Sequence, residues 1–109
     1  MANDVVKAIP LSSLNSTALS SSYQALNSSG LPAACFFIRI VNGGTTAITL
    51  SYDGITDNEQ VLNGQVFELP SQSNSQPGAF KALMSKGTVV YVKGSAGASG
   101  AITLSGYYT

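Results

Sequence analysis

Apolar and polar residues alternate, with the two-residue period of a β-strand, through most of the chain after residue 34. In the clearest case, residues 47–53, Ile48, Leu50 and Tyr52 share one face of the segment. Side chains of a strand point alternately to opposite faces, so this pattern predicts a strand with one buried face. Related patterns predict further strands at 35–41, 59–62, 65–70, 80–84, 88–94 and 101–109.

Turn-forming residues separate these segments at short intervals. Asn42-Gly43-Gly44, Asn63-Gly64 and Lys86-Gly87 each follow an apolar run, and Pro70 stops another. No segment keeps the period of a helix. About eight short strands joined by tight turns are typical of an antiparallel β-sandwich or jelly roll, and a small barrel is the alternative.

Residues 35–41 are apolar on both faces, which predicts a central strand. We expect it to form an antiparallel hairpin with residues 47–53. One face carries Phe37, Arg39 and Val41. The aliphatic part of a lone arginine can lie over such neighbours at a solvent-facing position. Aromatic residues and arginine also anchor protein interfaces, so a subunit contact is the second interpretation.

The chain divides by composition into a Ser-rich segment, residues 1–30, and a predicted sandwich domain, residues 31–109. The first segment has no sustained period, yet it contains more apolar residues, among them Leu11 and Leu14, than a free linker requires. We expect an extended arm or a loosely paired first strand. An arm that docks on a neighbouring subunit would bury these side chains.

Charged residues make up only 9% of the sequence, and five basic residues balance five acidic ones. This balance leaves no excess of positive charge that would bind a nucleic acid or an anionic membrane surface. A neutral, charge-poor surface does little to oppose association, so we expect a homo-oligomer. The sequence also lacks a signal-peptide pattern and a long apolar run, which predicts cytoplasmic synthesis without a membrane anchor.

The residue types needed for common catalysis are scarce. The sequence has no histidine, and Cys35 is its single cysteine, expected to be a small buried residue. A Ser85-Lys86 dyad lies at a turn without a further partner. We therefore expect no enzymatic activity, no cofactor and no bound metal.

The acidic stretch at Asp53, Asp57 and Glu59 allows two interpretations. With Asn58 it offers oxygen ligands for calcium, but its spacing differs from that of an EF-hand loop. Asp53-Gly54 and Asp57-Asn58 are also favoured turn pairs, because short polar side chains bond to their own backbone. Turn chemistry is the preferred interpretation.

Several segments follow one another in a recognisable order: "YQAL", "VNGG", "ITLSYDGITDN", "FELPSQS", "KGTVVYVKG" and the final "YY". This order resembles a group of small tailed-phage virion proteins. The resemblance covers about residues 23–108, implies a β-sandwich structural component and leaves out the first 22 residues. It depends on turn-and-strand patterns without a catalytic signature.

This resemblance implies a capsid decoration or cement protein that stabilises the head shell between capsid subunits. A tail, collar or fibre-adaptor protein is the alternative. A carbohydrate-binding module, using Tyr52 with the acidic stretch, is a further one. The implied partners are the major capsid protein or other virion proteins, and further copies in a dimer or trimer on the virion. The candidate interface residues are Phe37, Arg39, Val41, Tyr52, Tyr91, Tyr107, Leu11 and Leu14.

Overall fold

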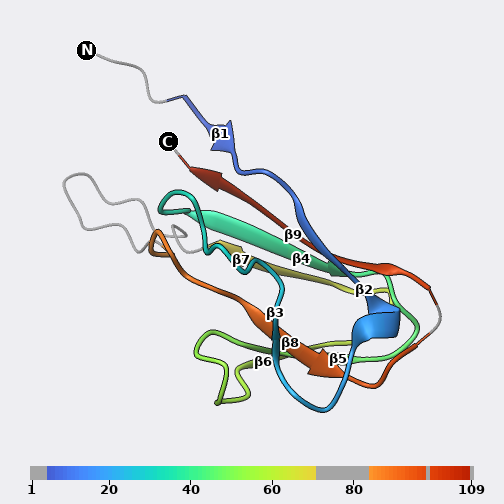
Figure 1. Ribbon diagram of the computed structural model, residues 1–109. Helices are drawn as coiled ribbons and strands as arrows, with labels where there is room; N and C mark the ends of the chain where they lie inside the picture. Colours follow the sequence, from blue (N-terminus) through green and yellow to red (C-terminus); the bar gives the residue numbers. More distant parts are fainter. Residues whose placement is uncertain (1–4, 71–83, 98, 109) are drawn as a thin grey trace.

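A computed structural model describes residues 5–70, 84–97 and 99–108 of the chain. Two antiparallel sheets face each other, with the apolar core between them (Figure 1). The elements, in chain order, are β1 (Lys7–Ala8), β2 (Ser12–Asn15), the 3-10 helix η1 (Ser16–Ala18), β3 (Gln24–Ala25), β4 (Phe37–Asn42), β5 (Ile48–Ser51), β6 (Glu59–Val61), β7 (Val66–Pro70), β8 (Tyr91–Gly94) and β9 (Ala101–Tyr108).

The β4–β9 sheet has the strand order β1-β9-β4-β7, and β2 also pairs with β9. The β5–β8 sheet has the order β3-β8-β5-β6. The strand pairs within both sheets are antiparallel. The prediction of an all-β antiparallel sandwich is confirmed, and the finer designation as a jelly roll stays a prediction.

The expected hairpin between residues 35–41 and 47–53 is wrong. β4 pairs with β7 and β9, whereas β5 pairs with β6 and β8 in the opposite sheet. The chain therefore crosses between the sheets after β4, although β4 is a central strand as expected. β4 and β5 each have one strongly apolar face. Because the two strands lie in opposite sheets, these faces meet across the core and both are buried.

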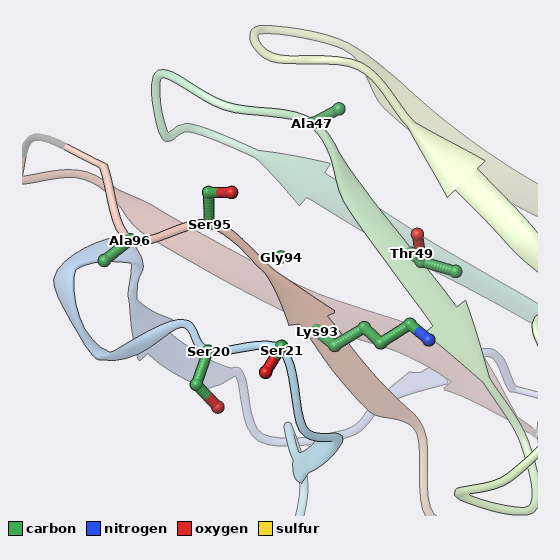
Figure 2. A pocket seen from close by; sticks show the side chains of 8 residues that line it. All are labelled: Ser20, Ser21, Ala47, Thr49, Lys93, Gly94, Ser95 and Ala96. Atoms are coloured by element: carbon green, nitrogen blue, oxygen red, sulfur yellow. The ribbon is translucent and has the colours of Figure 1, made fainter.

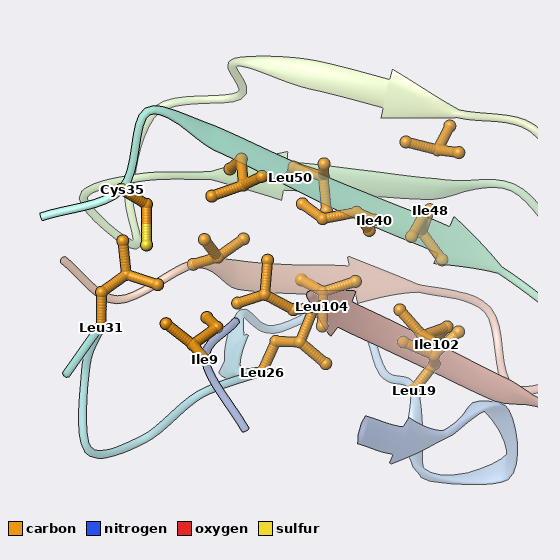
Figure 3. Close-up of a cluster of buried hydrophobic side chains, with 14 residues drawn as sticks. Ile9, Leu19, Leu26, Leu31, Cys35, Ile40, Ile48, Leu50, Ile102 and Leu104 are labelled. Atoms are coloured by element: carbon orange, nitrogen blue, oxygen red, sulfur yellow. The ribbon is translucent and has the colours of Figure 1, made fainter. Parts of the chain in front are cut away.

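Alternate residues of the central strands fill the core, as Figure 3 shows. Their side chains are at most 1% exposed, whereas neighbours on the other face, such as Val41 and Thr49, remain half-buried. The period-two pattern thus identified Ile48 and Leu50 correctly as inward residues. These inward pairs are Ile38 and Ile40, Ile48 and Leu50, Val90 and Val92, and Ile102 and Leu104.

The Ser-rich N-terminal segment supplies edge strands to both sheets. β1 and β2 pair with β9, and β3 pairs with β8. Ile9, Leu19 and Leu26 are between 4% and 7% exposed and belong to the core. The described part of this segment therefore completes the sandwich, while the boundary at residue 30 stays a prediction.

Cys35 is fully buried, as expected, and forms an isolated bridge with Met84 ahead of β4. Burial raises the pKa of its thiol. The predicted strand at 80–84 lies outside the described residues apart from Met84. The described helical structure is the short η1, and none of it is long and apolar enough to cross a membrane.

A buried amide connects the two sheets at the point where the chain crosses over. The Asn42 side chain donates to the backbone carbonyls of Thr46, at 2.8 Å, and Val61, at 3.1 Å, and its oxygen accepts from the Gly44 N–H at 3.1 Å. Asn42 ends β4, and Val61 ends β6 of the other sheet. The amide therefore satisfies backbone groups that a crossover would otherwise leave unpaired.

We predict that Leu50→Ala lowers the free energy of unfolding by about 2–5 kcal/mol, because it leaves a cavity in a closely packed core. Leu62→Ala is the matched control, since Leu62 is 56% exposed, and it should change stability by less than about 0.5 kcal/mol. Urea unfolding followed by circular dichroism measures both. Equal losses in the two variants would contradict the assigned core.

Asn42→Ala should destabilise the protein by about 1–3 kcal/mol, because the carbonyls of Thr46 in the crossover and of Val61 in β6 lose their donor. Asn63→Ala, at an exposed turn, provides the control and should stay within about 0.5 kcal/mol of the parent. Chemical denaturation decides this prediction. A neutral effect of Asn42→Ala would show that the amide does not connect the sheets energetically.

Candidate functional site

Asp53 and Asp57 of the acidic stretch lie in the loop between the paired strands β5 and β6, and Glu59 begins β6. The Asp53 carboxylate accepts from the backbone N–H groups of Ile55 and Thr56, both at 2.8 Å. It also accepts from the hydroxyls of Ser51, at 2.7 Å, and Thr56, at 2.9 Å. These bonds, the backbone ones first, hold the pKa of Asp53 well below its usual range. The turn interpretation is confirmed for Asp53.

Asp57 has a different role, which the sequence pattern did not indicate. Its carboxylate accepts from the Tyr23 hydroxyl at 2.5 Å and lies 3.1 Å from the Lys93 ammonium. The ammonium also lies 4.6 Å from the centroid of the Tyr23 ring. This cluster joins the β5–β6 loop to β8 and to Tyr23, which precedes β3. It therefore connects segments that belong to opposite edges of the β5–β8 sheet.

The electrostatics of this cluster follow from its contacts. The Tyr23 hydrogen bond, followed by Lys93, lowers the pKa of Asp57. Loss of hydration, followed by the bond to Asp57, raises the pKa of Tyr23 to about 12. Because Lys93 is already neutralised by Asp57, the cluster is suited to holding segments together and poorly suited to binding an anion. Within the described chain, no three cysteine or acidic side chains gather as metal ligands would.

A shallow hollow of about 630 Å³ lies beside this cluster on the outer face of the β5–β8 sheet (Figure 2). Small residues form its walls, and Lys93 is the one charged side chain that lines it. Its polar side chains are those of three serines, Thr49 and Lys93, and no acidic residue lines it. Its lining residues are Ser20, Ser21, Ala47, Thr49, Lys93, Gly94, Ser95 and Ala96.

The outer face of the β4–β9 sheet brings together four of the predicted interface residues: Phe37, Arg39, Val41 and Tyr107. The Phe37 and Tyr107 ring centroids are 5.9 Å apart, and the Arg39 guanidinium lies 5.7 Å from the Phe37 ring. Arg39 also forms an ion pair of 2.8 Å with Glu68 of β7. Both interpretations of Arg39 are compatible with this arrangement, so its place in an interface stays a prediction.

The other four candidate interface residues lie elsewhere. Tyr91 belongs to β8 of the opposite sheet, beside Gly54 of the acidic loop. Tyr52 and Leu14 pack against the core, and Leu11 is 65% exposed at the N-terminal edge. Burial, followed by Glu59, raises the pKa of Tyr52 to about 12. The candidates therefore lie on separate surfaces, because alternation assigns a face within one strand and cannot assign strands to sheets.

Large aliphatic side chains are exposed at both edges of the β4–β9 sheet. At the N-terminal edge, Val5 is 63% exposed, Val6 58% and Leu11 65%. At the β7 edge, Val66 is 51% exposed, and Leu62 in the preceding turn is 56% exposed. Exposed aliphatic residues on edge strands are sites where another chain can associate. Val5 and Val6 could be recognised from the sequence, because two β-branched residues occur there in an otherwise polar segment.

We predict that Asp53 contributes an acid-sensitive part of the stability. Because its pKa in the folded protein is lower than in the unfolded chain, this stabilisation is present above about pH 4 and is lost as the pH falls further. Asp53→Asn should therefore show a smaller loss of unfolding free energy between about pH 6 and about pH 2 than the parent does. Denaturant unfolding at several pH values measures it.

Asp53→Ala supplies the comparison for this experiment. It removes the same titrating group together with the acceptor of the Ile55 and Thr56 N–H groups, so it should be less stable than Asp53→Asn at neutral pH. An acid dependence of Asp53→Asn identical to that of the parent would refute the assigned role of the carboxylate.

Comparison with solved structures shows a shared fold. A chain from Bacillus endospore appendages, described as forming a novel family of disulfide-linked pili, matches with a TM-score of 0.51 and 15% identity, over 96% of this chain and 87% of that chain. PirA matches at a TM-score of 0.38 and 13% identity, over 99% and 97% of the chains, too loosely to guide interpretation. No family model and no curated protein matches the sequence.

The resemblance to tailed-phage virion proteins is wrong, because the solved structure that shares this fold is a chain of a spore-appendage pilus. The capsid decoration or cement function, the tail, collar or fibre alternative and the virion location are wrong with it. The comparisons give no support to a capsid protein partner, and the carbohydrate-binding alternative is not retained. The likeness to the appendage chain shows a shared fold.

Proposed function

We propose that this chain is a non-catalytic structural subunit that associates with copies of itself into a pilus-type surface appendage. The fold likeness to a pilus chain, over 96% of this chain, supports the class of protein. A shared fold does not by itself imply a shared function. Features of this chain's own surface must therefore support self-association.

The observation that carries the proposal is the group of exposed aliphatic side chains at the N-terminal edge of the β4–β9 sheet. Natural proteins protect such edges with charged side chains or a covering segment. Here β2 has the sequence Ser12–Asn15, without a charged residue, and no described residue pairs with its outer side. The exposed aliphatic residues Val5, Val6 and Leu11 flank it. Contact with a second copy would cover both the edge and these side chains.

The sparse charge of the protein supports the same conclusion. The formal net charge is zero, so copies experience little mutual repulsion. Several of the few charges are also neutralised in pairs, Arg39 with Glu68 and Lys93 with Asp57. A surface of this kind is suited to close packing of many copies and less suited to a dispersed monomer.

The subunits of this proposed assembly are held by non-covalent contacts. A linear polymer joined by disulfides requires at least two cysteines in each subunit, and this chain has one. Cys35 is fully buried, and burial raises the pKa of its thiol, which makes thiolate chemistry unfavourable. In this respect the chain differs from the disulfide-linked pili of similar fold.

The absence of enzymatic activity is part of the proposal. The sequence has no histidine, and Ser85 and Lys86 are both exposed in a turn. A nucleophile in such a position has no enclosed pocket that would exclude water or orient a substrate. A structural role requires none of this chemistry.

We expect the purified protein to form elongated particles in a concentration-dependent manner. Electron microscopy with negative stain and sedimentation velocity over a wide range of concentrations measure this. The particles should withstand a reducing agent, because the proposed contacts are non-covalent. Cys35→Ala should assemble as the parent does.

A protein that remains monomeric at every concentration would exclude the proposed function. Particles that dissociate on reduction, or that Cys35→Ala fails to form although it folds, would instead exclude the non-covalent arrangement. Circular dichroism of each variant separates a failure to fold from a failure to assemble.

A further inference from the structure

A small apolar groove opens where the two sheets meet at the N-terminal edge. Its volume is about 220 Å³. Ile9, Pro10 and Ser12 line it from the β4–β9 sheet, and the segment 27–32, which follows β3, lines it from the other side. Because Ile9 and Leu31 are core residues, the groove leads from the surface to the core.

The lining of the groove is adapted to an uncharged, apolar ligand. None of its lining residues carries a charge. Pro10 and Pro32 have no backbone N–H that would need a partner. Both ends of the Asn27 amide are already bonded, to the Thr88 carbonyl at 3.1 Å and to the Val90 N–H at 2.8 Å. Covering this amide with an apolar side chain would therefore leave no unsatisfied polar atom in it.

The edge beside the groove is irregular. From the pair Ala8–Tyr107 to the pair Ser12–Leu104, the edge advances by four residues while β9 advances by three. One residue is therefore extra, as in a β-bulge, and Pro10 lies within the same interval. A bulge and a proline disfavour a continuous hydrogen-bonded ladder with a new strand. A ligand here is held mainly by side chains that enter the groove.

The same chain contains a segment with the complementary chemistry. Val5 and Val6 are uncharged, β-branched and 63% and 58% exposed. β-branched side chains favour the extended conformation, in which successive residues point to opposite sides. One valine can thus enter a groove while the next covers its rim.

Val5 and Val6 cannot reach the groove of their own copy. The chain continues from them into β1, whose Lys7 and Ala8 pair with Tyr108 and Tyr107. To return to the groove beside Ile9, residues 5–6 would have to reverse direction within three residues that are already paired along β9. Such a reversal of the chain would require a tight turn, which these three paired residues do not provide. The groove of a second copy remains accessible to them.

We propose that the groove between Ile9–Ser12 and residues 27–32 binds the Val5–Val6 segment of a second copy of this chain. This inference rests on the proposed function and names the contact through which the copies associate. The donating segment and the accepting groove are different surfaces, so the contact is head-to-tail. Such contacts form an open chain of copies unless the rotation between them closes a ring.

Two variants separate the two halves of the contact. Val5→Ser with Val6→Ser removes the donated side chains, and Ile55→Ser is its control, because Ile55 is 83% exposed in the β5–β6 loop. Ser29→Trp fills the groove, and Ser22→Trp is its control, an exposed serine outside the groove. We expect both test variants to stay monomeric at concentrations at least tenfold above those at which the parent and the controls assemble.

Mixing the two test variants gives the decisive measurement. The Ser29→Trp copy retains Val5 and Val6, and the double-serine copy retains an open groove, so the mixture should form 1:1 complexes and nothing longer. Light scattering coupled to size exclusion measures their mass. Assembly of both variants in the same way as the parent, or no complex in the mixture, overturns the proposal. Parent particles that stop at a dimer overturn its head-to-tail arrangement.

A synthetic peptide with the sequence of residues 5–11 tests the groove even where the parent does not assemble. It should bind the double-serine variant, as measured by fluorescence anisotropy, and fail to bind Ser29→Trp. Peptide binding together with a monomeric parent would refute the proposed assembly and retain the groove. Absence of peptide binding, together with assembly of the parent, would retain the assembly and refute the groove.

Discussion

Aliphatic side chains of β4 and β9 pack against those of β5 and β8, and the arrangement of the rest of the molecule depends on this contact between two sheets. It places Ile40 and Leu104 opposite Ile48 and Leu50 within one buried cluster. Hydrophobic burial of this kind drives folding without specifying direction. After β4 the chain crosses to the other sheet, and the Asn42 amide at the end of β4 bonds to Thr46 of the crossover and to Val61 of β6. These directional bonds fix the crossover in a way that burial alone does not.

A sandwich of two sheets has open edges, and this protein uses its N-terminal segment to complete one side. β1 and β2 add to β9, and β3 adds to β8, so one stretch of chain contributes to both layers. The consequence is a boundary between the layers at which Ile9 and Leu31 reach the core and a groove remains. The residues that flank β1 and β2 expose the aliphatic side chains of Val5, Val6 and Leu11, so the segment that closes the monomer also offers a contact for another copy.

The charged groups are few, and most of those described serve local structure. Asp53 accepts four hydrogen bonds within its own loop, and Asp57 joins Tyr23 and Lys93 across the β5–β8 sheet. Once these charges are satisfied internally, little remains to repel a neighbouring copy or to attract a charged ligand. A neutral surface with apolar edges is physically consistent with a protein whose role is assembly.

The sequence by itself determined which residues share one face of each strand, because alternation depends only on the geometry of a strand. Where one face is polar, as in residues 47–53, it also identified Leu50 as a core residue, and it identified the turn at Asp53-Gly54. It did not determine which strands pair, since β4 and β5 have equally apolar faces and their pairing depends on contacts distant in sequence. For the same reason, only the tertiary structure brought Tyr23 to Asp57, separated the tyrosine candidates onto different surfaces and formed the groove between the two sheets.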